Sequence, residues 1–319
     1  MSRRPFASWA AGARPYPRAF LNRPLLMTRA GIVTVAGKPN AGKSTLLNRL
    51  VGQHLAITSP KPQSTRDRIV GLRSADGVQM VILDTPGLLE PRHQLHRAMR
   101  GAALAALRDA DVIVYLVDAS RDPVVPLEEV AGLVAPPKAP VLLALNKCDL
   151  VNQVVRRELA RTHPDAVVMS ARTGDGMPEL LAAIAARLPE SPFLYPEDDL
   201  STQHLRFFAG EAVREAALEQ LDEEVPHALA CEIEEFRETS APVYIRAVLH
   251  VERDSQKRIL IGSGGQRIKA IGKSARERIE VLVGGAVYLD LWVKVLPNWR
   301  RNPSALARFG YTLPPDDKK

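Results

Sequence analysis

The stretch GIVTVAGKPNAGKST, residues 31–45, decides the fold of the first half of the chain. Its first six residues form a short, largely β-branched run that stops at Gly37, and helical spacing begins at Lys43. The residues between them match G-x-x-x-x-G-K-S, a pattern that binds phosphate when it joins a strand to a helix. A glycine-rich turn that happens to precede Lys-Ser is the alternative, and the flanking strand and helix make it the weaker one.

Glycines in such a loop let backbone N–H groups curl around phosphate oxygens, and the N-terminus of the following helix adds its positive end. We expect the Lys43 ammonium to reach the β- and γ-phosphates of a bound nucleotide and the Ser44 hydroxyl to bind Mg²⁺. The sequence therefore predicts a nucleoside triphosphate site at the end of the first strand.

Further apolar runs occupy residues 78–83, 112–117, 141–145 and 167–169. They alternate with stretches of helical spacing at residues 96–108 and 178–188, the second of which opens with a proline. Strands that are apolar throughout and alternate with helices are typical of a parallel sheet covered on both faces. Residues 30–190 are thus predicted to form a doubly wound α/β domain with a mostly parallel sheet.

The motif Asp84-Thr-Pro-Gly87 follows the second of these strands. Alone it would be only a turn signal. At the carboxyl end of a core strand, however, the Asp84 carboxylate can hold Mg²⁺ through water and the Gly87 N–H can sense a γ-phosphate. Its position makes it the partner of the phosphate-binding loop.

The motif Asn146-Lys-Cys-Asp149 follows the strand at residues 141–145 and indicates which base is bound. The Asp149 carboxylate can accept hydrogen bonds from N1–H and the exocyclic amine of guanine, whereas adenine would leave that charge unpaired. Mismatches of this kind discriminate by about 10⁴. Ser170 and Ala171 follow the last short strand, and the Ala171 N–H would serve guanine O6. By itself the motif is equally an ordinary polar strand end; in order with the others it predicts GTP.

Residues 54–68, between the first two motifs, form a polar loop without periodicity. GTPases need a threonine here that coordinates Mg²⁺ only when the γ-phosphate is present, so that the loop orders and releases. Thr65 is predicted to take this role, with Ser64 as its competitor. The other residues of the loop are equally consistent with a plain surface loop.

The predicted catalytic residues are Lys43, Thr65, Asp84 and Gly87, and the predicted Mg²⁺ ligands are Ser44, Thr65 and Asp84. The predicted GTP contacts are Gly37, Lys38, Pro39, Asn40, Ala41, Gly42, Lys43, Ser44, Thr45, Asp84, Thr85, Pro86, Gly87, Leu88, Asn146, Lys147, Cys148, Asp149, Ser170 and Ala171.

The chain changes rhythm after the first domain. Residues 188–199 carry three prolines, and residues 191–204 are predicted to be a linker to a second domain at residues 205–319. The second domain shows the order α-β-β-α-α-β. Its expected elements are a helix at residues 205–221, strands at 229–236 and 243–251, a glycine-rich turn, a basic helical stretch, a helix at 275–283 and a strand at 287–295.

Residues 262–265 read G-x-x-G, the loop with which KH domains clamp about four nucleotides. Alone this signal is weak, and a helix–turn–helix corner explains it as well. The element order of a type II KH fold and the cluster of seven Lys and Arg against one Glu between residues 257 and 278 favour RNA binding. We expect a groove for the bases beside this loop, lined by Ile261, Ile268 and Ile271 or their neighbours. The predicted RNA contacts are Lys257, Arg258, Ile261, Gly262, Ser263, Gly264, Gly265, Gln266, Arg267, Ile268, Lys269 and Lys273.

Taken together, these motifs resemble the Era family of bacterial GTPases over about residues 30–319. The residues that carry the resemblance are GKPNAGKST at 37–45, QSTRDR at 63–68, DTPGL at 84–88, NKCD at 146–149, SARTG at 170–174, IGSGGQRIKAIG at 261–272 and LWVKVLPNW at 291–299. Ala41 and Ser64 stand where Val and Thr are commoner in the family, and neither change removes an essential contact.

The resemblance implies a GTPase domain followed by a smaller α+β type II KH domain. It also implies binding to the 3′ end of small-subunit (16S) ribosomal RNA, a role in maturing the small ribosomal subunit, and peripheral association with membranes. Leu88 stands where Ras-type GTPases carry a water-orienting glutamine, and the next glutamine is Gln94. We therefore expect slow intrinsic hydrolysis.

The composition agrees with a protein of the cytoplasm that binds a polyanion. The 319 residues carry a formal net charge of +7, with a pI near 9.5. The two cysteines, Cys148 and Cys231, fit a reducing compartment, and no apolar run approaches the roughly 20 residues that span a bilayer. Residues 1–29 are predicted to be a disordered arm or an artefact of a start upstream of Met27, in preference to a targeting peptide.

Three other functions share part of this evidence. A related translation or tRNA-modification GTPase would have the same first domain and a second domain that recognises protein. A scaffold would bind GTP without turnover. A membrane-surface switch would use the basic residues on anionic lipid. We expect a monomer that exchanges GTP and GDP.

Overall fold

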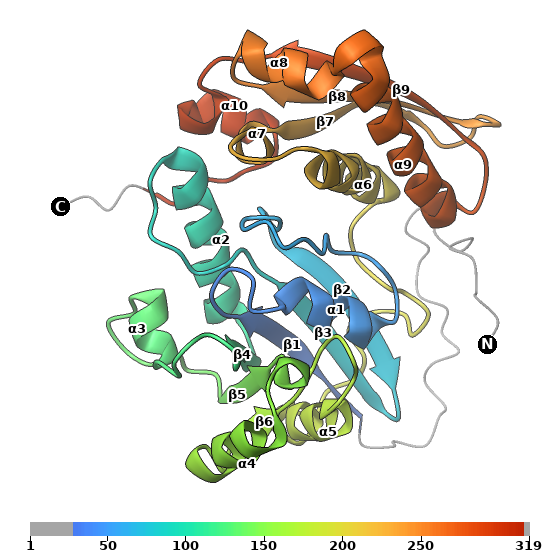
Figure 1. The fold of residues 1–319 in the computed structure, drawn as a ribbon. Coiled ribbons are helices and arrows are strands. Elements are labelled where there is room, and N and C mark those ends of the chain that lie inside the picture. Colours follow the sequence, from blue (N-terminus) through green and yellow to red (C-terminus); the bar gives the residue numbers. More distant parts are fainter. Residues whose placement is uncertain (1–27, 316–319) are drawn as a thin grey trace. The chain divides into compact units, whose positions relative to one another are not determined.

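The computed structural model describes residues 28–315 (Figure 1). These divide into two compact units, one of residues 28–202 with 311–315 and one of residues 203–310. The prediction for the arm at residues 1–29 lies outside the described residues as far as residue 27, and Arg29 already belongs to the first strand. Among the described residues, no helix is both long enough and apolar enough to cross a membrane.

The first unit is built on a six-stranded sheet in the order β2-β3-β1-β4-β5-β6. The strands are β1 Arg29–Ala36, β2 Ile69–Ala75, β3 Val78–Asp84, β4 Val112–Asp118, β5 Val141–Asn146 and β6 Val167–Val168. Every pairing is parallel except that of β2 with β3. The predicted doubly wound, mostly parallel sheet is confirmed. Because β1 lies between β3 and β4, the strand order reverses there, and such a reversal opens a crevice at the carboxyl edge of a sheet.

Helices cover both faces of this sheet (Figure 1). They are α1 Lys43–Val51, α2 Gln94–Asp109, α3 Leu127–Ala131, α4 Gln153–Thr162 and α5 Met177–Arg187, with a 3₁₀ turn η2 at Cys148–Leu150. All seven residues of β4 are buried, as expected for a central parallel strand. In α2 the buried residues Leu95, Met99, Ala103 and Ala106 recur at helical spacing. The first core therefore lies between α2 and the central strands.

Strand β2 was not predicted, because it follows directly on the polar loop at residues 54–68. It is the edge of the sheet, and the segment after α5 lies along it. The Leu72 N–H donates to the Leu200 carbonyl at 2.8 Å, and the Ser201 hydroxyl donates to the Val70 carbonyl at 2.5 Å. Part of the predicted linker thus satisfies backbone groups that an edge strand would otherwise leave open.

The second unit has a three-stranded sheet in the order β7-β8-β9, antiparallel between β7 and β8 and parallel between β8 and β9. Its strands are β7 Ala230–Arg237, β8 Val243–Val251 and β9 Val287–Val295. Its helices are α6 Leu205–Gln220, α7 Val225–Ala228, α8 Asp254–Ile261, α9 Gln266–Val283 and α10 Pro303–Arg308, with 3₁₀ turns η3 Ser263–Gly265 and η4 Trp299–Arg301. The order α6-β7-β8-α8-α9-β9 agrees with the predicted α-β-β-α-α-β, and α6 packs against α9.

The placement of the last two helices was wrong. Helix α8 lies before the glycine-rich turn. The two helical stretches predicted after the turn form the single helix α9. Gly272 lies within this helix, and a Cβ there would meet only Leu291, at 3.8 Å. The tail beyond β9 also packs, because Trp299 is fully buried and donates from Nε1 to the Ala228 carbonyl at 2.8 Å.

Candidate nucleotide and RNA sites

The loop after β1 needs glycine at both ends for steric reasons. Gly37 has φ 152°, and a Cβ there would lie 2.3 Å from the Leu116 carbonyl oxygen. Gly42 begins α1 with φ 100°, and its Cβ would lie 2.3 Å from the Asn146 side-chain nitrogen. The backbone of the loop is therefore packed closely against the ends of β4 and β5.

Lys43, the first residue of α1, is buried within the loop that precedes it. Its Nζ donates to the carbonyls of Gly37 at 3.2 Å and Lys38 at 2.8 Å. Burial lowers the pKa of Lys43 to about 8, and the Asp84 carboxylate acts in the opposite direction. The ammonium is thus held at the centre of the loop that was predicted to cradle phosphate.

Three oxygen-bearing side chains converge beside Lys43. Ser44 Oγ donates to Asp84 Oδ2 at 2.7 Å and lies 2.9 Å from Thr65 Oγ1, which itself donates to Asp84 Oδ2 at 3.2 Å. Burial raises the pKa of Asp84 above its ordinary value, against the effects of Lys43 and of these hydroxyls. The structure brings together all three predicted metal ligands, and the Thr65 hydroxyl contacts Asp84 directly.

This donor set fits a magnesium ion. Mg²⁺ prefers hard oxygen ligands and is held by one or two carboxylates together with substrate phosphates. Asp84 Oδ1 is buried and has no protein partner, so one carboxylate oxygen remains for a metal or its water. No cluster of three or more His, Cys, Asp or Glu that could hold a metal occurs among residues 28–315, which excludes from this part of the chain a site made by such side chains alone.

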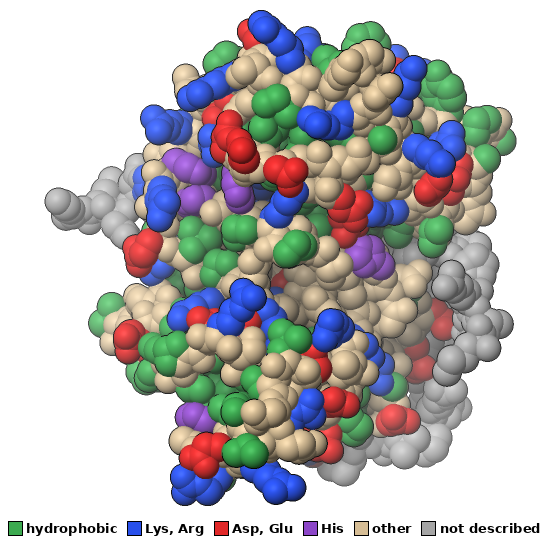
Figure 2. Space-filling model, viewed as in Figure 1, with side chains coloured by type: hydrophobic (Ala, Val, Ile, Leu, Met, Phe, Trp, Pro, Cys, Tyr) green, Lys and Arg blue, Asp and Glu red, His purple; other side chains and the backbone are tan. Residues whose placement is uncertain are grey.

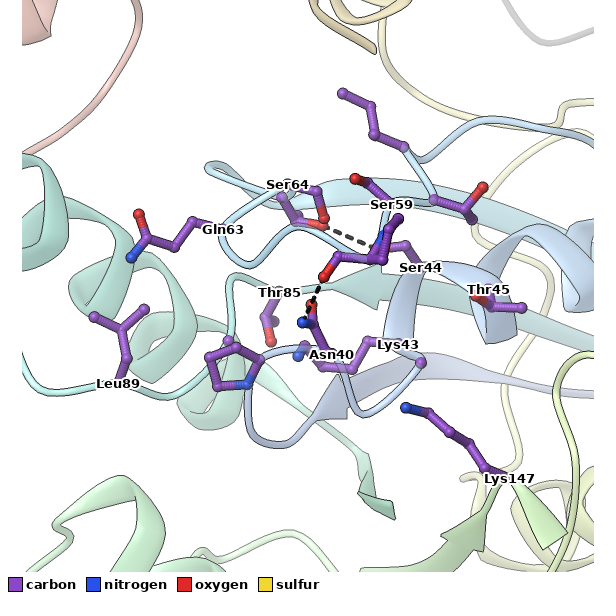
Figure 3. Close-up of a pocket in the computed structure, with 17 residues that line it drawn as sticks. Asn40, Lys43, Ser44, Thr45, Ser59, Gln63, Ser64, Thr85, Leu89 and Lys147 are labelled. Atoms are coloured by element: carbon purple, nitrogen blue, oxygen red, sulfur yellow. Dashed lines mark hydrogen bonds between the residues drawn. The ribbon is translucent and has the colours of Figure 1, made fainter. Parts of the chain in front are cut away.

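A cavity of about 330 Å³ opens over these groups (Figure 3). Figure 3 shows Lys43 and Ser44 from α1 beside Asn40 of the loop, with Lys147 approaching from the end of β5. Besides predicted residues, it is lined by Ile57, Thr58, Ser59, Pro60, Gln63, Ser64 and Leu89. Sequence reasoning assigned no role to these residues except Ser64, because a loop without periodicity gives no signal of which side chains face inward.

Gly87 and Leu88 lie against the phosphate-binding loop in different ways. A Cβ on Gly87 would lie 2.8 Å from the backbone of Pro39, so only glycine allows this close approach. The Leu88 N–H donates to the Gly37 carbonyl at 3.1 Å, while its side chain is buried in the core cluster with Leu107 and Ile113. Leu88 is therefore a core residue by its side chain and a loop contact only by its backbone.

At the base end, Asn146 connects two loops. Its Nδ2 donates to the Ala41 carbonyl at 2.7 Å, and its Oδ1 accepts from the Ala171 N–H at 2.8 Å. The predicted donor to guanine O6 is thus engaged with Asn146. Lys147 donates to Asp118 Oδ2 at 2.5 Å. Asp118, at the end of β4, thus orients Lys147, a predicted GTP contact for which the sequence indicated no partner.

Asp149, in the 3₁₀ turn η2, is held by the loop that follows β6. Its Oδ1 accepts from Ser170 Oγ at 2.5 Å, and its Oδ2 accepts from Arg172 Nε at 3.1 Å and from Arg172 Nη2. Partial burial acts to raise the pKa of Asp149, but the hydrogen bonds from Ser170 and Arg172 outweigh it and keep that pKa below its ordinary value. The carboxylate is therefore ionised at neutral pH, as a guanine acceptor must be.

The second candidate site is the turn between α8 and α9. Gly262 has φ 74°, and a Cβ there would meet Arg267 Cβ at 2.8 Å, so this glycine is required by the turn itself. Gly264 has φ 56° and open space around it. Ile261 and Ile268 are half-buried beside the turn. The prediction that Ile271 lines a groove is wrong, because Ile271 is fully buried in the core.

The basic residues around this turn divide by what they contact. Arg267 donates to the Ile259 carbonyl at 2.5 Å, and Arg278 contacts both carboxylate oxygens of Glu219 on α6. Lys273 lies 4.0 Å from Glu277 and Arg276 lies 3.8 Å from Glu280, all on α9. Lys257, Arg258 and Lys269 have no ion pair among the described residues. Lys and Arg side chains are spread over the surface around α8 (Figure 2).

Comparison with known proteins agrees with both sites. Residues 32–147 match the family described as 50S ribosome-binding GTPase, and residues 224–300 match the KH domain. GTPase Era of Geobacter metallireducens is 40% identical over 292 residues, which cover 89% of this chain and 98% of that protein. The chain belongs to the Era family of GTPases. Its first unit is accordingly a GTPase domain and its second unit carries an RNA-binding KH domain.

Further Era proteins extend the match. GTPase Era of Pseudomonas aeruginosa is 42% identical over 89% of this chain and 95% of its own length. A crystal structure of Era in complex with MgGDPNP and nucleotides 1506–1542 of 16S ribosomal RNA matches with a TM-score of 0.83 and 39% identity, over 90% of this chain and all of that one. A variant of Aquifex aeolicus Era bound to GDP and aluminium fluoride matches equally well, with the same TM-score and coverage.

Proposed function

We propose that this Era-family GTPase binds 16S ribosomal RNA near its 3′ end and assists maturation of the small ribosomal subunit. The observation that carries the proposal is the glycine-rich turn at residues 262–265, with open space at Gly264. Around it lie the cations Lys257, Arg258 and Lys269, which form no ion pair within residues 28–315. Support comes from the 39% identical Era that was solved with a fragment of this RNA. The protein acts as a switch timed by GTP, monomeric and cytoplasmic, with peripheral association at anionic membranes.

In the GTPase domain the predicted residues around the cavity and at the base end have separate tasks. Lys43 and the loop N–H groups bind the β- and γ-phosphates, and the Gly87 N–H contacts the γ-phosphate. Ser44, Thr65 and Asp84 would hold Mg²⁺, Asp84 by way of water. When bound, the metal neutralises charge that develops on the phosphate oxygens. Asp149 accepts from guanine, and Asn146 holds the two loops around the base.

Intrinsic hydrolysis is slow, because the residue after Gly87 has no polar side chain that could orient the attacking water. Leu88 stands at the place where Ras-type GTPases carry a glutamine, and its side chain is buried in the core. Gln63 lines the cavity and is the only amide side chain in the loop at residues 54–68. Backbone groups, a bound cation or a partner would complete the arrangement.

The test is RNA binding by the full chain with Gly264→Asp. A Cβ at Gly264 would meet nothing within 4 Å, so aspartate would not clash with its neighbours, and its charge opposes phosphate. The positive φ strains any side chain there, aspartate less than most. Gly310→Asp is the matched control, because Gly310 also has positive φ and open space and lies in the same unit. We expect Gly264→Asp to abolish the gel shift of a 16S 3′-end oligonucleotide and to leave GDP affinity intact.

Equal binding by the Gly264→Asp variant would contradict the proposal and point to a second domain that recognises protein. Loss of both RNA and GDP binding would mean that the variant is unfolded, which the control variant and a thermal melt would reveal. Flotation with anionic liposomes, with and without the oligonucleotide, separates binding of lipid from binding of RNA by the same cations.

A further inference from the structure

Both oxygens of the acceptor predicted to select guanine already accept hydrogen bonds from the chain itself. Asp149 Oδ1 accepts from Ser170 Oγ, and Asp149 Oδ2 accepts two N–H donors from Arg172. The Asp149 side chain is only 9% exposed, whereas that of Arg172 is 70% exposed. Arg172 therefore covers Asp149 from the solvent side.

The donors of Arg172 match those of the base. A guanidinium presents parallel N–H groups in one plane, a geometry that suits a carboxylate. The N1–H and exocyclic amine of guanine present two parallel N–H donors in the same way. We propose that Arg172 is an internal competitor of guanine for Asp149, so that it sets how tightly the chain holds GTP and GDP. This inference rests on the proposed role of Asp149.

The backbone beneath Arg172 is fixed independently of this ion pair. Arg49 on α1 donates from its guanidinium to the carbonyls of Ala171 and Arg172, and the Gly174 N–H donates to the Ser170 carbonyl at 2.8 Å. The exchange of Arg172 for guanine thus requires a rotation of one exposed side chain rather than a movement of the loop. Consistently, the lining of the cavity includes Lys147 but neither Asp149 nor Arg172.

The size of the effect follows from exposure. Ion pairs with one partner in solvent contribute little, so removal of the competitor is expected to tighten guanine nucleotide binding by about two- to fivefold. Arg172→Lys keeps the charge but lacks the paired donors, and its affinity should lie between those of the wild type and Arg172→Ala.

The experiment measures the Kd of GDP by calorimetry for the full chain with Arg172→Ala, alone and combined with Asp149→Asn. Arg161→Ala is the matched control, because Arg161 is 76% exposed and pairs with Glu158 on α4, in the same unit. We expect tighter binding for Arg172→Ala, no change for Arg161→Ala, and no effect of Arg172→Ala once Asp149 is Asn.

The outcomes separate this inference from the proposed function. If Asp149→Asn does not weaken GDP binding, Asp149 does not read guanine and both statements fail. If Asp149→Asn weakens binding but Arg172→Ala leaves it unchanged or also weakens it, only the competition is overturned. A tightening by Arg172→Ala that persists in the Asp149→Asn background would likewise assign the effect to another contact.

Discussion

Lys43 is the residue whose ionisation should govern nucleotide affinity. Burial lowers its pKa to about 8, whereas bound phosphate favours the cation and raises that pKa. Binding then takes up a proton above pH 8, so affinity should be constant up to about pH 7.5 and weaken toward tenfold per pH unit above pH 8. Calorimetry with GDP from pH 6.5 to 9 would measure this slope. A flat profile, or an equal slope in Lys43→Met, would contradict it.

The same shift has the opposite consequence for stability. The unfolded chain binds a proton at Lys43 up to the ordinary pKa of 10.5, while the folded chain releases it near pH 8. Because the unfolded state then binds more protons, the contribution of Lys43 to the free energy of unfolding rises as pH increases from 8 toward 10.5. Affinity and this contribution to stability therefore change in opposite directions over the same pH range, which is characteristic of a buried residue kept for binding.

Leu88 gives a second prediction at this scale. Since its side chain lies in the core cluster with Leu107 and Ile113, Leu88→Gln would bury an amide rather than supply a catalytic one. We expect it to lower the free energy of unfolding by about 1–3 kcal/mol, and Leu88→Met by less than about 1.5 kcal/mol. Denaturant titrations of the two variants test this. Faster GTP hydrolysis with unchanged stability would show that the glutamine reaches the cavity.

Among the elements, the sequence predicted those with a local signal. The phosphate-binding loop, Asp84 and Asn146 follow apolar strands directly, and parallel strands bring their carboxyl ends to one edge, so their meeting was predictable. Strand β2 was not, because it is defined by its pairing with β3 and not by a pattern of its own. Nor could the sequence show that Asp118 orients Lys147, a contact between residues far apart in the chain.

Helix α9 shows the same limit for charge. Its cations form one cluster in the sequence, yet Arg278 contacts Glu219 on α6 whereas Lys269 is exposed without an ion pair among the described residues. We expect Arg278→Ala to destabilise the chain by about 1–2 kcal/mol and leave RNA affinity unchanged. Lys269→Ala should do the reverse, and reduce the slope of log affinity against log salt by about 1. Filter binding at several salt concentrations and thermal melts would distinguish them; equal losses of RNA affinity would contradict the assignment.

For the whole molecule, the segment at residues 191–202 is a covalent connection from the GTPase domain to the KH domain. The fully buried side chain of Gln79, on β3, bonds this segment to the sheet. Gln79 accepts from the N–H groups of Leu194 and Tyr195 at 2.7 and 2.9 Å, and it donates to the Tyr195 carbonyl at 2.8 Å. The same segment bonds to β2, which continues directly from the loop of Thr65. A rearrangement at Thr65 therefore acts on a strand that the segment is bonded to.

This connection predicts that nucleotide and RNA affinities are coupled through the hydrogen bonds between Gln79 and residues 194–195. If GTP changes RNA affinity by some factor, RNA must change GTP affinity by the same factor. Gln79→Leu leaves the two N–H groups without their acceptor, so it should increase amide hydrogen exchange at residues 194–195 and bring that factor toward one. RNA titrations with GDP and with a non-hydrolysable GTP analogue measure the factor. If amide exchange at residues 194–195 increases but the coupling factor does not change, the coupling does not depend on the hydrogen bonds of Gln79, whose role would then be structural only.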